Sequence, residues 1–208
     1  MLDRFILPVQ KTLLAPVARA GLRLGITADQ ITIAGFLLGV LAVPALAFGH
    51  AGIGLLLILA NRIADGLDGA MARIAGPTDR GAFLDISFDF LFYALVPLGF
   101  ALADPGRNAI PAAVLITSFV GTGSSFLAFG VIAEKRGLSA EAYPTKGFFY
   151  LGGLTEGTET ILFFFAMCLW PSIFWLLAWI FAGLCMLTVL TRWSAGWRAF
   201  APNDTWSS

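Results

Sequence analysis

Charge is scarce in this sequence, and so are the residues that usually hold zinc. Charged residues make up 12% of the 208 positions, whereas an ordinary soluble domain carries about 25%. With 58% hydrophobic residues and a mean hydropathy of +0.84, the chain is predicted to be an all-α integral membrane protein. Its 13 basic and 13 acidic residues cancel, so overall charge gives no reason to expect nucleic acid as a partner.

The two cysteines, Cys168 and Cys185, both lie inside apolar stretches. A small polarizable thiol packs well among aliphatic side chains and needs no oxidising compartment there. We therefore expect both to be core residues rather than redox or metal-binding groups.

The apolar residues fall into stretches long enough to cross a membrane, for which a helix needs about 20 residues. Six stretches qualify: 30–49, 52–73, 81–103, 109–133, 147–168 and 171–192. An even number of spans places both termini on one side, and in that topology Arg107 is the one residue of the 13 basic residues on the opposite side. Because Lys and Arg concentrate on the cytoplasmic side, both termini are predicted to be cytoplasmic.

Residues 1–23 precede the first span and carry basic residues scattered among apolar ones, without the cleavage site of a secretory signal. This segment is predicted to lie in the membrane interface as an amphipathic helix, with Pro8 and Pro16 limiting its regularity. A plain cytoplasmic leader is the alternative. Nothing is left over for a soluble domain, so residues 1–208 are predicted to form one membrane domain with a six-helix bundle over 30–192.

Four aspartates interrupt two of the apolar stretches: Asp65, Asp68, Asp85 and Asp89. The two stretches form a predicted hairpin with its turn near Pro77, so residues equally far from the turn lie at equal depth. Asp65 and Asp89 both stand 12 residues from Pro77. Within each helix the aspartates stand three or four residues apart, on one face. The four carboxylates are therefore predicted to meet slightly below the cytoplasmic surface.

Four ionised carboxylates in a hydrocarbon environment need neutralisation, because each costs at least roughly 2.5 to 3.5 kcal/mol to insert. Two divalent cations would return the four positive charges, and an all-oxygen ligand set without His or Cys favours Mg²⁺ or Mn²⁺ over zinc. Gly66 and Gly69 let a ligand approach closely. Arg73, one turn beyond Asp68, can bind phosphate oxygens with two hydrogen bonds. These parts indicate phosphoryl or nucleotidyl transfer.

This arrangement resembles the signature of the CDP-alcohol phosphotransferase family. Two Asp, a Gly, an Ala-Arg pair, a second Gly and two further Asp recur at these spacings in the segments Asp65 to Arg73 and Gly81 to Asp89. The interval between Arg73 and Gly81 is seven residues here, one fewer than in the usual pattern. In length and six-helix layout, nearly the whole chain is similar to small inner-membrane members of the family from Gram-negative bacteria.

The resemblance implies a transferase that moves a phosphatidyl group from CDP-diacylglycerol to a small polar alcohol and releases CMP. It implies that two Mg²⁺ or Mn²⁺ ions are held by Asp65, Asp68, Asp85 and Asp89, with Asp89 also the general base. The residues that it implies for the cytidine diphosphate pocket are Asp68, Gly69, Ala72, Arg73 and Gly81. It further implies a homodimer in the bacterial inner membrane, acting on membrane lipids in phospholipid biosynthesis.

The acceptor alcohol is open among glycerol phosphate, inositol phosphate, serine and an amino alcohol. Candidate acceptor-binding residues are charged groups near the aspartates or toward the cytoplasmic surface: Arg62, Lys146, Glu156 and Glu159. Arg62 lies one turn deeper than Asp65, where it either binds an acceptor phosphate or pairs with one of the two glutamates.

The glutamates lie in the segment Gly152 to Thr160, which is either a solvated helix start or part of an acceptor pocket. This segment resembles the Gly-Pro-Thr-Glu-Gly stretch of eukaryotic choline and ethanolamine phosphotransferases, with Leu154 in place of the Pro. That resemblance keeps open the opposite donor, a CDP-amino alcohol, with diacylglycerol as acceptor.

Two alternatives to a metal site would also explain the aspartates. An ionic clasp with Arg62, Arg73 and Arg80 would leave one carboxylate over, and buried ion pairs rarely add net stability. A cation transporter is the alternative from another class, since acidic residues within a membrane also mark ion pathways. A transporter predicts acidic residues spread through the membrane depth, whereas these four cluster toward one face.

Overall fold

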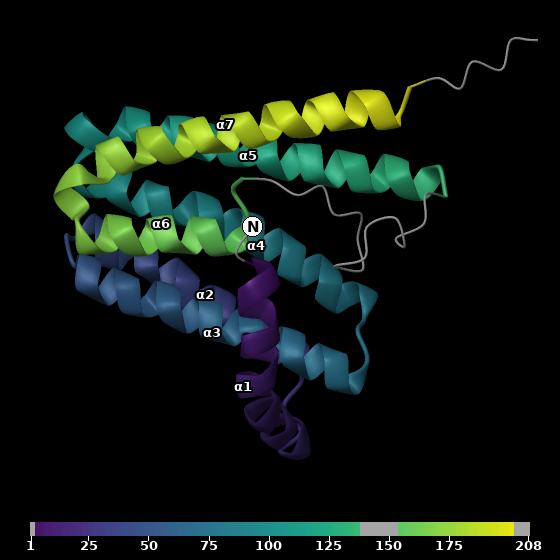
Figure 1. Ribbon diagram of the computed structural model, residues 1–208. Helices are drawn as coiled ribbons and strands as arrows, with labels where there is room; N and C mark the ends of the chain where they lie inside the picture. Colours follow the sequence, from purple (N-terminus) through teal and green to yellow (C-terminus); the bar gives the residue numbers. More distant parts are fainter. Residues whose placement is uncertain (1–2, 138–153, 202–208) are drawn as a thin grey trace, which may run out of the picture.

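The computed structural model describes residues 3–137 and 154–201, with side chains from Leu13 onward. Every regular element in these residues is a helix (Figure 1), which confirms the all-α class. The helices are α1 (Asp3–Arg23), α2 (Ala28–Ala47), α3 (Ala51–Ala75), α4 (Asp79–Ala103), α5 (Pro105–Lys135), α6 (Gly157–Leu169) and α7 (Phe174–Ala199), with a 3₁₀ turn, η2 (Pro171–Ile173), before α7.

Four helices in the described part of the chain are long and apolar enough to cross a membrane, namely α2, α4, α5 and α7. The 25-residue α3 has the length, but it carries the charged side chains of Arg62, Asp65, Asp68 and Arg73. The 13-residue α6 is apolar but short. The structure therefore supports a membrane protein with four candidate spans, and the count of six stays a prediction.

The predicted span 147–168 is described only in its later part. Residues 147–153 lie outside the described residues, and residues 154–156 form a bend and an irregular position rather than a helix. α6 begins at Gly157, where the Glu156 amide donates a hydrogen bond to Glu159 Oε2 at 3.2 Å. A carboxylate at a helix start accepts from amides that have no partner within the helix, which favours a boundary at this point.

The N-terminal helix α1 runs through Pro8 and Pro16 without a break, so the expected loss of regularity is wrong. α1 crosses the bundle at a steep angle and packs on α3 (Figure 1). Ala18 is fully buried there, in a cluster with Ala70 and Met71 of α3. Packing of one apolar face stabilises the helix enough to offset the hydrogen bonds that the prolines remove. Whether α1 lies in the membrane interface stays a prediction.

α3 and α4 form the predicted hairpin, and its turn holds Pro77. α3 ends before Gly76, whose φ of +98° is a left-handed conformation that other residues rarely adopt. Thr78 caps the start of α4, because its Oγ1 accepts a hydrogen bond from the Gly81 amide at 3.0 Å. α2 packs against both arms of this hairpin, so three helices surround the aspartates.

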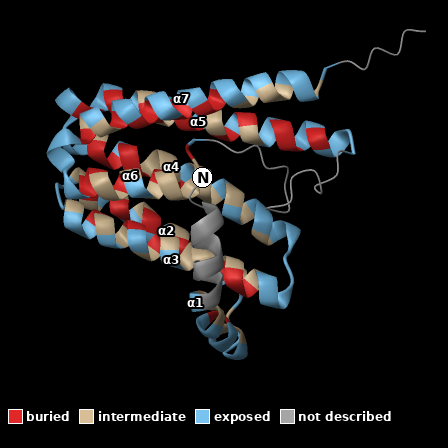
Figure 2. Ribbon diagram, viewed as in Figure 1, coloured by how far each residue is buried: buried red, intermediate tan, exposed pale blue. Residues whose placement is uncertain are grey.

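The apolar core extends from α2 and α3 across α4, α5, α6 and α7, and buried residues occur on all of these helices (Figure 2). Phe119 belongs to this core and makes edge-to-face contacts to Phe164 and Phe181 at centroid distances of 6.1 and 5.9 Å. Cys168 and Cys185 are free thiols buried in this cluster, which confirms that they are core residues.

Candidate metal centre

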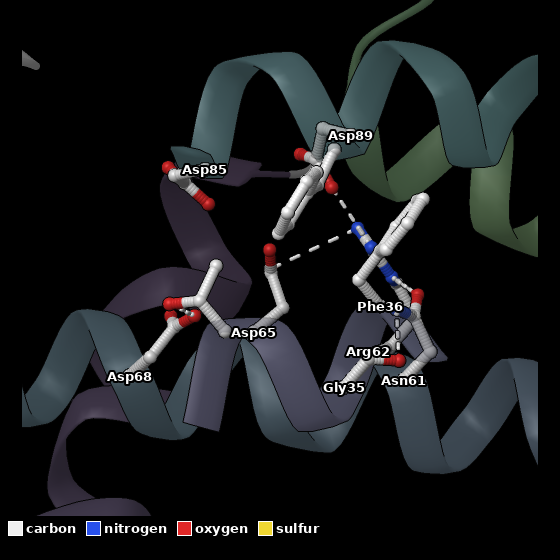
Figure 3. Close-up of a pocket in the computed structure, with 10 residues that line it drawn as sticks. Gly35, Phe36, Asn61, Arg62, Asp65, Asp68, Asp85 and Asp89 are labelled. Atoms are coloured by element: carbon white, nitrogen blue, oxygen red, sulfur yellow. Dashed lines mark hydrogen bonds and ion pairs between the residues drawn. The ribbon is translucent and has the colours of Figure 1, made fainter. Parts of the chain in front are cut away.

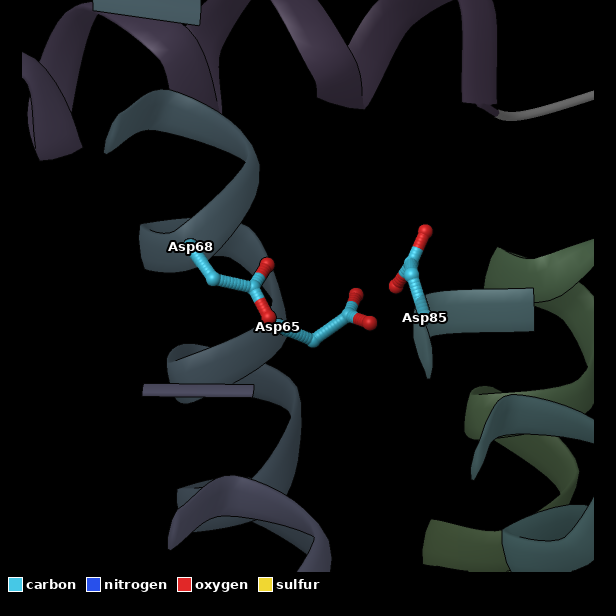
Figure 4. Close-up of side chains that lie close together, drawn as sticks. All are labelled: Asp65, Asp68 and Asp85. Atoms are coloured by element: carbon cyan, nitrogen blue, oxygen red, sulfur yellow. The ribbon is translucent and has the colours of Figure 1, made fainter. Parts of the chain in front are cut away.

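Three carboxylates converge across the α3–α4 hairpin. Asp65 and Asp68 come from one face of α3 and Asp85 comes from α4, and the three side chains point toward one another (Figure 4). One oxygen from each lies within 4.8 Å of the others. Oxygens around one Mg²⁺ at about 2.1 Å lie up to about 4.2 Å apart, so small side-chain rotations bring these oxygens to ligand distance. The predicted convergence is confirmed for these three residues.

Asp89 lies in the same pocket but forms an ion pair with an arginine. Its Oδ1 accepts a hydrogen bond from Arg62 Nη2 at 2.8 Å, as Figure 3 shows. Arg62 Nη1 lies 3.7 Å from Asp65 Oδ2, which joins Asp65 to the same guanidinium. Asp65 and Asp89, predicted to lie at equal depth, are therefore bridged by Arg62.

The donor set of this pocket suits a hard divalent cation. The pocket has a volume of about 10 Å³, close to the smallest cavity that holds a water-sized ligand. Four of the residues that line it are the aspartates, and the remainder includes Thr32 and Asn61 but neither His nor Cys. Carboxylate oxygens are the ligands that Mg²⁺ and Mn²⁺ prefer, so the residues fit the predicted metal and disfavour zinc.

Two uncharged polar residues support the aspartates and were missed in the sequence. Thr32 on α2 donates a hydrogen bond from Oγ1 to Asp68 Oδ2, and Asn61 accepts one from Arg62 Nε at 2.8 Å. Both are polar residues inside apolar stretches, which is the signal that sequence reasoning had available. Thr32 orients the Asp68 carboxylate from α2, and Asn61 orients the Arg62 guanidinium from α3 itself.

The residues implied for the nucleotide lie toward the turn of the hairpin. Arg73 is exposed, and a Cβ added at Gly69 would lie 3.4 Å from Arg73 Nη1, so the arginine folds back along its own helix. Gly81 and Ala72 are half-buried. These residues lie between the turn and the Asp68 carboxylate, where a ligand reaching the aspartates from that end would pass.

The arginines do not form the clasp that was one alternative. Arg80 pairs with Asp29 of α2, with 2.6 Å between Nη2 and Oδ2. Arg62 is the one of the three that has ion pairs with the aspartate cluster among the described residues. One guanidinium offsets one of four carboxylates, so positive charge from another source is still needed.

A second, larger cavity of about 380 Å³ lies among α4, α5, α6 and α7. Its walls are mainly apolar and aromatic, and its polar lining residues are Tyr93, Thr122, Ser124, Thr155, Glu156, Thr160, Cys185 and Arg192. The two sites are neighbours, because Tyr93 lines the cavity and its ring centre lies 5.7 Å from the guanidinium carbon of Arg62, which lines the metal pocket. We call the two sites the metal pocket and the large cavity.

The candidate acceptor residues do not share one place. Arg62 lines the metal pocket and Glu156 lines the large cavity, while Glu159 accepts a hydrogen bond from the Glu156 amide. Lys146 lies outside the described residues.

Arg192 is a large-cavity residue that the sequence had suggested for topology alone. Its Nη1 donates to the Thr122 carbonyl oxygen at 2.9 Å. Its Nε is buried without a hydrogen-bond partner in the described structure, and its guanidinium carbon lies 5.7 Å from the Phe126 ring centre. The available signal was a cation at the end of a long apolar stretch.

Comparison with known proteins agrees with this architecture. Residues 25–190 match the family described as CDP-alcohol phosphatidyltransferase. The chain is 54% identical over 195 residues to the inner membrane protein YnjF of Escherichia coli (strain K12), covering 93% of this chain and 95% of YnjF. It is 33% identical over 140 residues to the archaetidylinositol phosphate synthase of Pyrococcus horikoshii, covering 62% of this chain and 74% of that enzyme.

Solved structures of the Mycobacterium tuberculosis phosphatidylinositol phosphate synthase have a similar fold. The structure with CDP-DAG bound superposes with a TM-score of 0.74 at 24% identity, covering 95% of this chain and 100% of that one. The structure with manganese and citrate gives a TM-score of 0.65 at 26% identity, covering 88% of both chains. The matched family residues include the whole α3–α4 hairpin.

Proposed function

The chain belongs to the CDP-alcohol phosphatidyltransferase family of membrane transferases, and we propose that it transfers a phosphatidyl group from CDP-diacylglycerol to a small polar alcohol with release of CMP. The observation that carries this proposal is the convergence of three carboxylates from two arms of a hairpin, with Asp89 in the same pocket. The bound CDP-DAG of the mycobacterial synthase supports the choice of donor.

The metal pocket would hold two Mg²⁺ or Mn²⁺ ions through Asp65, Asp68 and Asp85, with Asp89 as a further ligand. Bound divalent cations supply charge that polarises a diphosphate and stabilises CMP as it departs. Arg73 would bind diphosphate oxygens from the turn end. The remaining residues proposed for the nucleotide pocket are Asp68, Gly69, Ala72 and Gly81.

Asp89 is the proposed general base, and its orientation supports that role. Arg62 holds Oδ1, and the other carboxylate oxygen points away from Arg62 (Figure 3). That second oxygen would take the proton of the acceptor hydroxyl as the hydroxyl oxygen attacks phosphorus. Because an ionised carboxylate is a weak base, its contribution comes chiefly from being placed beside the acceptor.

The large cavity is the proposed acceptor site. Its volume of about 380 Å³ suits a small ligand, and its lining residue Tyr93 lies beside Arg62 of the metal pocket. Glu156 and Arg192 bring one negative and one positive charge to its walls. Glu156 suits an ammonium group and Arg192 suits a phosphate or carboxylate, so the lining fits serine, an amino alcohol and the two phosphorylated alcohols. The same glutamate supports the second candidate, a CDP-amino alcohol with diacylglycerol.

The proposed topology follows from the distribution of Lys and Arg along the chain. α3 and the stretch ending in α6 would complete six spans, with both termini in the cytoplasm and α1 in the interface of the bacterial inner membrane. Residues 1–208 would form a single domain, and the implied homodimer stays a prediction.

A substrate panel tests the function. The purified protein would be given labelled CDP-diacylglycerol, Mg²⁺ or Mn²⁺, and each of the four candidate alcohols in turn, with product lipids resolved by mass; a parallel arm uses CDP-amino alcohol with diacylglycerol. We expect CMP release with one alcohol, lost in Asp89→Asn. Metal-dependent ion flux across vesicles without any CMP release would refute the enzyme and support a transporter.

A further inference from the structure

We propose that Arg62 is a built-in counter-ion of the metal pocket, which shares Asp89 and Asp65 with the metal and thereby weakens metal binding. This inference rests on the proposed metal site. Arg62 lies outside both signature segments, Asp65 to Arg73 and Gly81 to Asp89, so neither segment assigns it a role.

Two hydrogen bonds and a longer ion pair hold the guanidinium of Arg62 in one orientation. Nε donates to Asn61 Oδ1 at 2.8 Å, Nη2 donates to Asp89 Oδ1 at 2.8 Å, and Nη1 lies 3.7 Å from Asp65 Oδ2. Asn61 is itself fixed, because its Nδ2 donates to the Gly35 carbonyl oxygen at 2.9 Å and its side chain is buried. Two of the five N–H donors of the guanidinium are engaged by Asn61 and Asp89, so Arg62 has fewer donors for an acceptor phosphate than a free arginine.

The Phe92 ring and the close approach of α2 also enclose the Arg62 guanidinium. The guanidinium carbon lies 4.6 Å from the centre of the Phe92 ring, and the Arg62 side chain is 15% exposed. α2 approaches closely here because Gly39 has no side chain: an added Cβ would lie 2.7 Å from Phe92 Cδ2 and 3.1 Å from Asn61 Nδ2. Three helices therefore bury this cation within the metal pocket and fix its position there.

The consequence for metal binding follows from charge. Four carboxylates line the metal pocket with Arg62, so the net charge of the group is less negative than the aspartates alone would make it. A divalent ion bound among Asp65, Asp68 and Asp85 is repelled by the guanidinium that touches Asp65. It must also compete with Arg62 for Asp89. Arg62 therefore stabilises the protein before an ion binds and lowers the affinity for the ion afterwards.

Titration with Mn²⁺ alone, without nucleotide or lipid substrate, tests the inference. Free Mn²⁺ is measured by electron paramagnetic resonance on the full chain in detergent. We expect Arg62→Gln to bind Mn²⁺ about tenfold more tightly or better, and Arg62→Lys, which keeps the charge, to stay near the wild-type affinity. The matched control is Arg107→Gln, at the far end of the bundle. Arg107 also has its guanidinium carbon near an aromatic ring, 5.6 Å from the centre of the Trp175 ring. Unchanged or weaker binding in Arg62→Gln would overturn the proposal.

A double variant decides the question if Arg62→Gln does not fold, because it removes the pair together. In Asp89→Asn the guanidinium keeps its charge but loses its nearest carboxylate, so Mn²⁺ binding should weaken. Adding Arg62→Gln to Asp89→Asn should restore about tenfold of that affinity, and no recovery would refute the counter-ion. A wild-type protein that binds no Mn²⁺ would refute the proposed metal site itself, whereas wild-type binding that ignores Arg62 would refute this inference alone.

Discussion

The metal pocket and the large cavity are built in opposite ways. The metal pocket has about 10 Å³ of space, and charged side chains of the α3–α4 hairpin line it together with the uncharged Thr32, Gly35 and Phe36 of α2. Hydrogen bonds join Thr32 to Asp68 and Arg62 to Asp89. The large cavity has about 380 Å³, and four helices from α4 to α7 surround it with mainly apolar walls. A crowded ionic site depends on each charge and position, whereas a roomy apolar cavity tolerates change and sets which ligand fits.

The largest effect is expected from removing one charge of the metal pocket. Asp85→Asn takes away the carboxylate that α4 contributes to the cluster, and we expect CMP release to fall about 10³-fold or more, with weaker Mn²⁺ binding. The control is Asp104→Asn, where Asp104 Oδ1 accepts a bond from the Arg107 amide at 3.3 Å as a helix cap. Asn caps equally well, so a similar loss in this control would undermine the comparison.

Filling the large cavity should have a smaller and more selective effect. Ala94→Phe adds bulk to a wall of the large cavity, and we expect the KM for the acceptor alcohol to rise about tenfold or more while Mn²⁺ affinity stays the same. Ala113→Phe adds the same bulk on an exposed face of α5 and should change neither. A rise in the KM for CDP-diacylglycerol instead would mean that this cavity serves the donor.

Removing an uncharged hydrogen-bond donor of the metal pocket should lower Mn²⁺ affinity less than removing one of its charges. Thr32→Val removes the hydroxyl that donates to Asp68, and one hydrogen bond to a charged group contributes about 1.5 to 3 kcal/mol. We expect Mn²⁺ affinity to fall about tenfold, measured by the same resonance titration. Thr117→Val removes a hydroxyl that donates to the Ala113 carbonyl oxygen and should leave the affinity unchanged.

The smallest effect is expected at the surface ion pair between Arg80 and Asp29. The Arg80 side chain is 79% exposed, and such pairs contribute about 0 to 1 kcal/mol. Arg80→Gln should therefore shift the thermal unfolding midpoint by little and the Mn²⁺ affinity not at all. A large loss of Mn²⁺ binding would show that the metal pocket extends to the turn of the hairpin.

Much of the metal pocket was predictable because its parts are close in sequence. Asp65 and Asp68 share a helical face by spacing alone, and a short turn at Pro77 brings Asp85 opposite them. The partner of Arg62 was not predictable in the same way, since the sequence offered Glu156 and Glu159 as well as the aspartates. The structure pairs it with Asp89 and Asp65, at a place where α2 packs against both α3 and α4 and Gly39 lies close to Asn61 and Phe92.

Helix boundaries and the large cavity were harder. α1 continues through Pro16 because Ala18 is buried on α3, a contact between segments about 50 residues apart in the chain. α6 begins at Gly157, after a bend at residues 154 and 155, although the predicted span ran through these positions. Arg192 reaches the same cavity as Glu156 through the packing of α7 beside α5 and α6, which no local pattern indicates.

The amino-acid sequence alone determined the helical class, the hairpin and the carboxylates that meet across it, because periodicity and short connections act over a few turns of helix. Tertiary structure alone decided where Arg62 pairs, where α6 starts and which residues enclose the large cavity. Those features depend on which helices touch, and burial of side chains between distant segments outweighs local preference wherever the two disagree.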